Sequence, residues 1–315
     1  MADILDPSTP TGGSPSGQMD DELRALKRFL RDVYGVPVAP NQLLTPAMSI
    51  DVNGVVTFTS PPKGMRGMPG VYGFTAANNV ATPTTKLDMA ASLVVAKDPN
   101  THVVAAAAPA TLTVDTALAG PAVLGRDQAA VFSNNTWIHF YYIYNPTTAT
   151  LSAICSNSSS APTLPSGFTQ FAYAVSVLKD GTGILRNVIV RGSWVWLINP
   201  VTALSGGVST SDAAISLSLI IPPNAYNFQL ACLLIINTPV TSGGDIIFLS
   251  LVAGNDFAGL SRVSASAGFG GSSTEKILLP NISQQFLYRI QRISTGGTFS
   301  ADFAVLGYSV GNGDS

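Results

Sequence analysis

The segment FTQFAYAVSVLKDGTGILRNVIV, residues 168–190, carries the clearest structural signal in the chain. Large and small side chains alternate along its first half. The large ones are Phe171, Tyr173, Val175 and Val177, and the small ones are Ala172, Ala174 and Ser176. Since successive side chains of a strand point to opposite faces, the pattern predicts a strand with one bulky and one small face, against which a second sheet packs closely. Asp180-Gly181 predicts a turn that leads into a returning strand over 184–190.

The rest of the chain carries similar short apolar runs separated by turn residues. Residues 48–60, MSIDVNGVVTFTS, alternate around Asn53-Gly54, which is the strongest short hairpin signal. The Pro/Gly-rich stretch 60–70 reads as a linker. Residues 71–200 and 201–315 each contain at least six predicted strands at 8–12-residue spacing. The sequence therefore predicts a hairpin and linker over 36–70, followed by two antiparallel, jelly-roll-like β-sandwich domains, 71–200 and 201–315.

The N-terminal region differs from the rest of the chain. Residues 1–18 predict an irregular arm, and QMDDELRALKRFLRDVYG, residues 18–35, predicts a short amphipathic helix with acidic residues first and basic residues later, as the helix dipole favours. Its apolar seam consists of Leu23, Leu26, Leu30 and Val33, with Phe29 beside it. Two interpretations remain open: the helix packs on its own domain, or it forms a self-associating bundle or a peg that docks on another protein. A helix of about 15 residues is marginal alone, which favours the second.

The composition excludes several classes of function. Charged residues make up 11% of the chain, hydrophobic residues 46%, and the net charge is −2. This balance offers no electrostatic basis for binding nucleic acid or anionic membranes. No secretory signal and no membrane-spanning segment is recognised, so we expect synthesis in a cytoplasm. We expect Cys155 and Cys232 to be buried thiols rather than a disulfide.

Residues suited to catalysis are scarce. His139 lies in the aromatic segment TWIHFYYIY, where a packed or hydrogen-bonded histidine is expected, and His102 follows a turn, where a solvated one is expected. Glutamate occurs only at Glu22, in the predicted helix, and at Glu275, in a predicted loop. The aspartates that a pair of catalytic carboxylates would draw on are Asp212, Asp245, Asp256 and Asp302. No metal-ligand spacing and no phosphate-binding loop is recognised, so we predict a protein that is not an enzyme and has no cofactor or metal.

Trp194 and Trp196, in GSWVWL, project from the same face of a predicted strand. Packing in a core or a subunit interface is one interpretation, and contact with a glycan is the other.

Three segments together resemble bacteriophage tail-fibre and related virion proteins. They are ADILDPSTPTGGSPSGQMDDELRALKRFL (2–30), TWIHFYYIYNPTTATLSAICSNSSSAPTLPSGFTQFAYAVSVLKDGTG (136–183), and the pair IPPNAYNFQLACLLI (221–235) and FAVLGYSV (303–310). The resemblance lies in the order of these motifs, and it implies a homotrimeric, non-enzymatic virion component. The chain departs from the family in lacking a long repetitive shaft, which fits a short appendage and leaves open whether it mounts on the tail or on the head.

The leading expectation is a short trimeric tail fibre of a bacteriophage virion. The N-terminal segment would attach it to other virion proteins, and the β-domains would project toward the host surface. The alternatives are a capsid decoration or head-fibre protein, a carbohydrate-binding module that contacts host glycans through Trp194 and Trp196, and an enzyme that depolymerises surface polysaccharide. Expected partners are two further copies of the chain and other virion proteins, without nucleic acid or membrane insertion.

Overall fold

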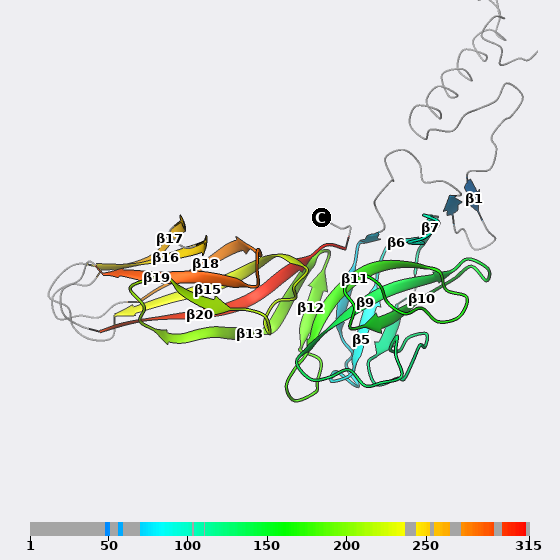
Figure 1. Cartoon of the computed structure of the whole chain (residues 1–315), viewed down its shortest axis with the longest axis horizontal. Coiled ribbons are helices and arrows are strands. Elements are labelled where there is room, and N and C mark those ends of the chain that lie inside the picture. Colours follow the sequence, from blue (N-terminus) through cyan, green and yellow to red (C-terminus); the bar gives the residue numbers. More distant parts are fainter. Residues whose placement is uncertain are drawn as a thin grey trace, which may run out of the picture.

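The computed structural model contains only strands, turns and loops in the residues that it describes (Figure 1). Those residues are 48–50, 56–58, 70–102, 104–109, 111–236, 244–252, 255–264, 272–292 and 298–312. The predicted N-terminal helix and its apolar seam lie outside them. All strand pairs are antiparallel, as the alternating patterns predicted, and they form three sheets.

Sheet A contains the segment that opened the sequence analysis. Its strands, in spatial order, are β1 (Met48–Ile50), β2 (Val56–Phe58), β7 (Val104–Ala107), β6 (Leu93–Lys97), β11 (Gln170–Lys179), β9 (Thr136–Asn145) and β10 (Thr150–Ser156), and β3 (Gly70–Tyr72) also pairs with β6. The hairpin predicted around Asn53-Gly54 is confirmed, because β1 pairs with β2. Through β2 and β7 this hairpin belongs to the same sheet as β11.

Sheet B, like sheet A, contains eight strands, and it runs through both halves of the molecule. Its order is β18 (Ser272–Pro280), β15 (Ala225–Ile236), β20 (Phe299–Val310), β13 (Trp194–Gly207), β12 (Val188–Arg191), β4 (Thr75–Asn78), β5 (Lys86–Ala90) and β8 (Leu112–Asp115). Sheet C consists of β14 (Ala213–Ser216), β19 (Gln285–Arg292), β16 (Gly244–Val252) and β17 (Asn255–Ser264).

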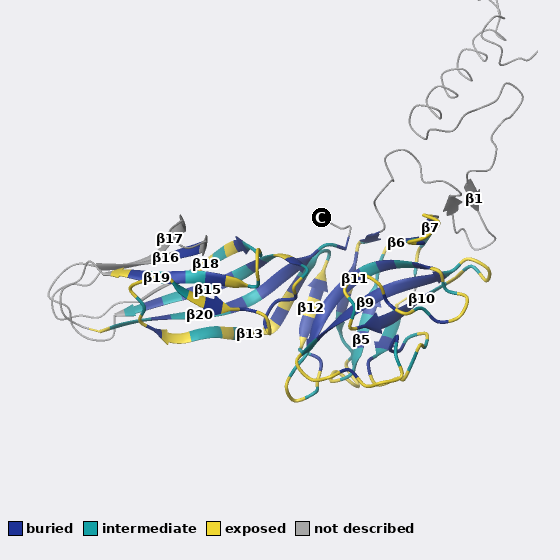
Figure 2. Cartoon of the chain, in the orientation of Figure 1, coloured by how far each residue is buried: buried dark blue, intermediate teal, exposed yellow. Residues whose placement is uncertain are grey.

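The three sheets form two lobes (Figure 1). In the first lobe, sheet A packs on β4, β5, β8 and β12 of sheet B. In the second lobe, sheet C packs on β15, β18 and β20. One cluster of buried side chains includes members from both lobes, among them Met89, Phe140, Phe228 and Phe286 (Figure 2). The sequence predicted two separate sandwiches, whereas the lobes share one sheet and one core.

The predicted domain boundaries fall inside strands. The boundary between 70 and 71 lies in β3, and the boundary between 200 and 201 lies in β13. Proline at position 200 does not end β13; instead the pairing with β20 is irregular between Trp196 and Val201. Bulges of this kind accommodate a residue that cannot donate a ladder hydrogen bond. The division into two domains stays a prediction, with its boundary inside a continuous strand.

The alternation predicted for residues 171–177 is wrong beyond Tyr173. Against β9, Tyr173 pairs with Tyr141 while Val175 pairs with Phe140, so Ala174 is an extra residue in a β-bulge. A bulge reverses the face on which the following side chains lie. Phe171 and Tyr173 therefore pack outside the sandwich against Tyr141 and its neighbours, whereas Val175 and Val177 face the main core.

The turn at Asp180-Gly181 is confirmed, but the returning segment does not form the next strand of the same sheet. The Asp180 carboxylate accepts hydrogen bonds from the backbone N–H groups of Thr182 and Ile184. Only Lys179 and Leu185 form a bridge, and the chain then crosses to sheet B, where β12 pairs with β4 and β13. The second half of the segment thus links the two sheets of the first lobe.

Candidate functional site

His139 is buried in a polar cluster on sheet A, as its aromatic sequence context predicted. Its side chain is 3% exposed, and its Nδ1 lies 2.7 Å from Ser176 Oγ. Burial lowers the pKa of His139 to about 4, so the imidazole is neutral at pH 7. Ser176 is itself completely buried, so a substrate has no access to its hydroxyl. The pair is therefore a structural contact, although a serine beside a histidine is the arrangement of a nucleophile and its base.

The other residues considered for catalysis lie apart in the fold. His102 is exposed, as predicted, with a φ of 61°. Asp212 forms an ion pair with Arg289 of sheet C, whereas Asp302 of sheet B accepts a hydrogen bond from the Gly206 N–H. Glu275 lies in β18 rather than in a loop.

Two further sequence questions concern cysteines and metals. Cys155 and Cys232 are both buried and no disulfide joins them, as expected, and burial raises the pKa of the Cys155 thiol well above its usual range. Among the residues that the structure describes, no three His, Cys, Asp or Glu side chains come together as metal ligands. Within the same residues, no helix is long and apolar enough to cross a lipid bilayer.

Trp194 and Trp196 lie on the outer face of sheet B, opposite the core. Val195 and Leu197, which alternate with the tryptophans along β13, point into the core, and Trp196 remains 40% exposed. The two indoles stack on each other with centroids 5.5 Å apart and planes inclined by 22°. Each ring therefore covers one face of the other, and the pair presents its outer faces and edges to solvent.

The strand register places the tryptophans in two rows that cross five strands, because directly paired residues of an antiparallel sheet lie on the same face. We call these ten residues the waist face. One row is Leu278, Gln229, Gly307, Trp196 and Ile189, and the other is Pro280, Asn227, Ser309, Trp194 and Arg191. Only Arg191, at one end, carries a charge. Strand spacing of about 4.8 Å makes the face roughly 19 Å wide.

Gly307 allows β13 and β20 to approach closely within the waist face. A Cβ added at this position would lie 2.5 Å from the Val195 carbonyl oxygen and 3.3 Å from Trp196 Cε3. Because the first of these atoms is backbone and cannot move aside, any larger residue would force the strands apart.

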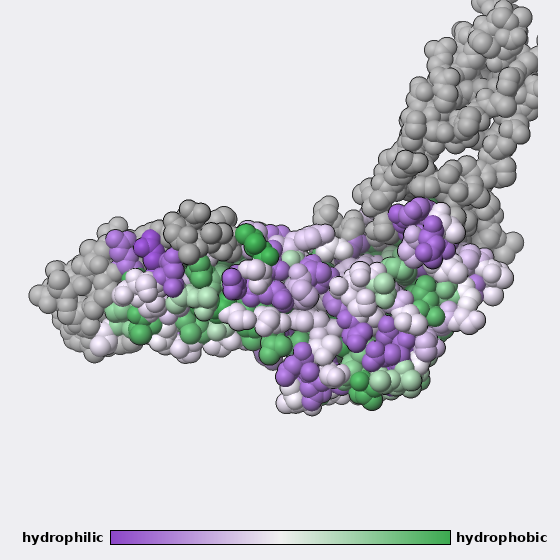
Figure 3. All heavy atoms as spheres, in the orientation of Figure 1, coloured by the Kyte–Doolittle hydropathy of each residue, from purple (hydrophilic) through white to green (hydrophobic). Residues whose placement is uncertain are grey.

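Apolar residues extend the outer face of sheet B beyond the waist. Ile198 continues the row of exposed side chains along β13. Farther along, a shallow hollow of about 240 Å³ lies over β13, β15 and β20. Its lining includes Thr202, Ala231, Leu233, Asp302 and Ala304. Figure 3 shows one side of the whole molecule, on which hydrophobic and hydrophilic residues are interspersed over both lobes.

A second exposed surface lies at one end of the first lobe, where three loops meet; we call residues 79–85, 116–135 and 180–186 the loop end. Leu185 N–H donates to the Thr84 carbonyl, and Thr116 N–H donates to the Thr85 carbonyl. The loop end carries the aliphatic side chains of Val80, which is 96% exposed, and of Val131, Leu118, Val123 and Ile184.

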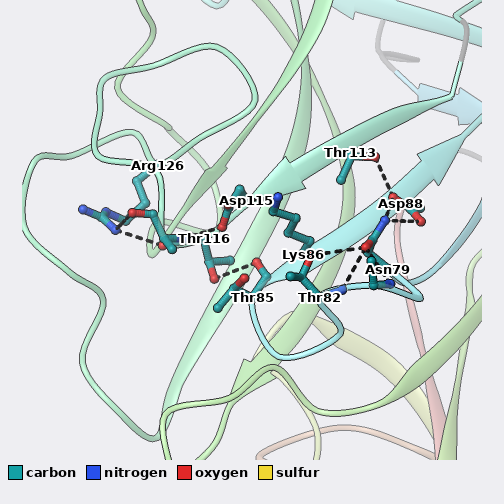
Figure 4. A network of polar contacts seen from close by, with 11 residues as sticks. Asn79, Thr82, Thr85, Lys86, Asp88, Thr113, Asp115, Thr116 and Arg126 are labelled. Atoms are coloured by element: carbon teal, nitrogen blue, oxygen red, sulfur yellow. Dashed lines mark hydrogen bonds and ion pairs between the residues drawn. The ribbon is translucent and has the colours of Figure 1, made fainter.

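The Arg126 side chain is buried under residues 116–135, the longest of these loops, and forms hydrogen bonds to their backbone (Figure 4). It is 3% exposed, and its guanidinium donates to the carbonyls of residues 116, 117 and 129 at 2.9–3.0 Å, with a longer contact from Nε to residue 128. The same loop closes the open side of the first lobe, because Leu124 accepts from Asp115 of β8 and donates to Ala153 of β10. It thereby covers an edge strand of sheet A and an edge strand of sheet B, which would otherwise be open to pairing with another chain.

Asp88 organises the neighbouring loop in the same way (Figure 4). Its carboxylate accepts hydrogen bonds from Thr113 Oγ1 at 2.6 Å and from the Asn79 amide at 3.0 Å. Asn79 in turn accepts from the backbone of Ala81 and Thr82. Buried polar side chains thus fix the conformation of these loops by hydrogen bonds. The side chains that the loops expose to solvent include the aliphatic ones named above.

Sequence reasoning identified Trp194 and Trp196 but missed the residues around them. Ile189 comes from the preceding strand β12, whereas Gln229, Gly307 and Leu278 come from strands that are distant in sequence, and only the register brings them together. Arg126 was also missed, because beside Asp127 it reads as one of two adjacent charges of a loop, and only the tertiary structure shows that it is buried. The predicted anchor residues Leu23, Leu26, Phe29, Leu30 and Val33 lie outside the described residues.

Comparison with known proteins assigns no family. No family model matches the chain, and no curated protein matches it. Nine chains among solved structures match. One, in the structure of infectious bursal disease virus Gx strain, is 12% identical with a TM-score of 0.23, and the match covers 85% of this chain and 65% of that chain.

A second match, in the VP2 subviral particle of infectious bursal disease virus, is 10% identical with a TM-score of 0.20, and it covers 85% of this chain and 64% of that one. The chain thus spans slightly less than two thirds of the length of these chains. Likenesses at such scores do not establish a common fold, and nothing about function is drawn from them.

Replacing Arg126 with Met should destabilise the protein by roughly 3 kcal/mol or more, because several backbone carbonyls lose their donor in a buried site. Arg126→Lys should also destabilise it, because an ammonium cannot reproduce the planar fork. Urea denaturation measures both, and Lys97→Met, at a partly exposed cation outside the loop end and the waist face, is the control, with an expected change within about 0.5 kcal/mol. Equal effects of Arg126→Met and Lys97→Met would show that Arg126 does not hold the loop.

Proposed function

We propose that this chain is a structural protein of a bacteriophage virion, most plausibly a short trimeric tail fibre. Its N-terminal segment attaches it to the particle, and its β-lobes project and contact the host surface. The observation that carries the structural role is the waist face, an almost uncharged band with exposed apolar side chains that crosses strands from both lobes. The assignment to a virion rests on the family resemblance of residues 2–30, 136–183, 221–235 and 303–310.

The waist face has the character of the centre of a subunit interface. Interface cores are depleted in charge and enriched in aromatic residues, and Trp is frequent among the residues that dominate binding. A stable interface buries about 800 Å² on each partner, which is more than the waist face alone offers. Ile198 and the hollow over β13, β15 and β20, whose lining mixes apolar residues with Thr202, Ser205 and Asp302, lie on the same side of sheet B and would supply further area.

We expect the full chain to be trimeric, and Trp196→Asp to weaken the trimer by at least about 2 kcal/mol per subunit, roughly 30-fold, because the indole contact is lost and a carboxylate is buried in an apolar contact. Light scattering after gel filtration over a concentration series measures the change. Val80→Asp is the control, since it places the same charge on a more exposed aliphatic position at the loop end.

If the Trp196→Asp and Val80→Asp proteins form equally stable trimers, the waist face is not part of the interface, although the protein is still a trimer. A wild-type chain that stays monomeric at micromolar concentration would contradict the trimer itself.

Attachment is proposed to depend on the apolar seam of residues 23–33. Leu26→Asp should abolish incorporation into particles, because it places a charge in an apolar contact, whereas Lys27→Asp should reduce incorporation only slightly, as changes of surface charge usually do. Quantitative blotting of purified particles measures both variants. The two positions are adjacent, so a general loss of helix propensity affects both alike, and equal incorporation would contradict the anchor. Labelling the incorporated protein and imaging particles would separate a tail fibre from a head fibre or capsid decoration protein.

Glycan recognition is the second candidate, and the exposure of Trp196 in the same row of the sheet as Gln229, with only Gly307 between them, favours it. Aromatic faces and amide groups are the usual means by which proteins hold sugars. If this reading is right, Trp196→Ala should abolish binding on a glycan array while the trimer stays intact. Loss of the trimer without any glycan signal in the wild-type protein would instead favour the subunit interface.

A further inference from the structure

Arg191 carries the charge of the waist face, and its backbone is held in a fixed position. It ends β12, and the turn of Gly192 and Ser193 leads directly into β13. The Gly192 carbonyl accepts a hydrogen bond from Asn312 Nδ2 at 2.8 Å, and the Ser193 carbonyl accepts one from Val310 N–H at 2.9 Å. The side chain therefore starts from a rigid backbone at one end of the waist face.

The guanidinium of Arg191 is available to a ligand. The residue is exposed, and among the residues that the structure describes no acceptor forms an ion pair or a hydrogen bond with this guanidinium. Asp88 lies on the same outer face of sheet B, two strands away from β12, and it already accepts hydrogen bonds from Asn79 and Thr113. The N–H donors of Arg191 are thus free to bind an anion from outside the chain.

The aromatic pair lies beside this cation. Arg191 is directly opposite Trp194 in the register of β12 and β13, and the Trp196 indole stacks on Trp194 with centroids 5.5 Å apart. An indole offers a large apolar surface on which the C–H face of a sugar ring can pack. An anionic group that binds Arg191 is therefore held next to a surface suited to a neutral ring.

Neutral polar groups lie on the other side of the tryptophans. Ser309 and Asn227 continue the row of Trp194, and Asn227 Nδ2 donates to Ser309 Oγ at 3.4 Å, which leaves the amide oxygen to accept from a ligand hydroxyl. From Arg191 to Asn227 the row crosses three strand spacings, roughly 14 Å. This span is longer than one sugar ring, so the ligand that fits it is an oligosaccharide.

We propose that the waist face binds an acidic oligosaccharide, whose carboxylate accepts hydrogen bonds from Arg191 while a neighbouring neutral ring packs on the tryptophans. This inference rests on the glycan recognition given above as the second candidate, and it names the class of glycan. The planar guanidinium matches the two oxygens of a carboxylate. A neutral glycan over Arg191 would remove water from a cation without supplying an anion, which weakens binding. The site therefore selects for charge as well as for shape.

A glycan array tests the proposal with the full chain. The array carries neutral oligosaccharides beside the same oligosaccharides with a uronic acid or a sulfate ester, and titration of the bound ones gives affinities. The carboxylated form should bind at least about 10-fold more tightly than its neutral counterpart, because a charge-assisted contact is added. This preference should decline as the salt concentration rises.

Arg191→Gln should abolish the preference for the carboxylated form and leave the affinity for the neutral form unchanged, which a merely structural role would not do. Arg191→Lys should keep part of the preference, since an ammonium keeps the charge and loses the planar fork. Lys276→Gln is the matched control, because Lys276 is an exposed cation on the same outer face of sheet B, opposite Ala231 and outside the waist face. It should bind as wild type.

The inference is overturned if the wild-type protein binds neutral and carboxylated forms equally, if it prefers the sulfated form, or if Arg191→Gln keeps the preference. Neutral glycans that bind in a manner dependent on Trp196 would leave glycan recognition standing and remove only the acidic class. A wild-type protein that binds no glycan on the array would overturn both, without bearing on the structural role.

Discussion

The pairing of β13 with β20 is the interaction on which the rest of the structure depends. β13 joins the first lobe to the second through one ladder, with β12 on one side and β20 on the other. Without it, sheet B would divide into two sheets, one in each lobe, and the lobes would no longer share a sheet. Because β13 has a buried face and an outward face along its first half, the same strand places Val195 and Leu197 in the core and the two tryptophans on the surface.

Two kinds of surface result from this arrangement. The waist face is flat because it is the outer face of sheet B. Its apolar side chains point away from the core and are not part of it. The loop end is built from turns, and its shape depends on buried polar groups such as Arg126 and Asp88. Holding loops in one conformation before binding reduces the entropy lost on association. Both surfaces suit a protein that assembles with other copies and contacts an outside partner, which is the role proposed here.

The contact between the lobes differs from both surfaces in chemistry. Tyr308 OH donates to the Ser176 carbonyl, and Trp137 Nε1 donates to the Ser218 carbonyl. Buried hydrogen bonds of this kind are satisfied in only one arrangement, so they fix how the second lobe meets sheet A.

The sequence by itself determined the β-class of the described chain, the hairpin at Asn53-Gly54, the turn at Asp180, the burial of His139 and the common face of the two tryptophans. Each of these depends on neighbours within a few residues, through the strand period of two or the conformational preferences of turn residues. Tertiary structure alone decided the bulge at Ala174, the crossing of residues 184–190 to sheet B, the shared core of the lobes and the partners of Arg126 and Ser176. These depend on pairing between strands that are distant in sequence, and since a one-residue shift in register exchanges the two faces of a strand, local alternation does not reveal them.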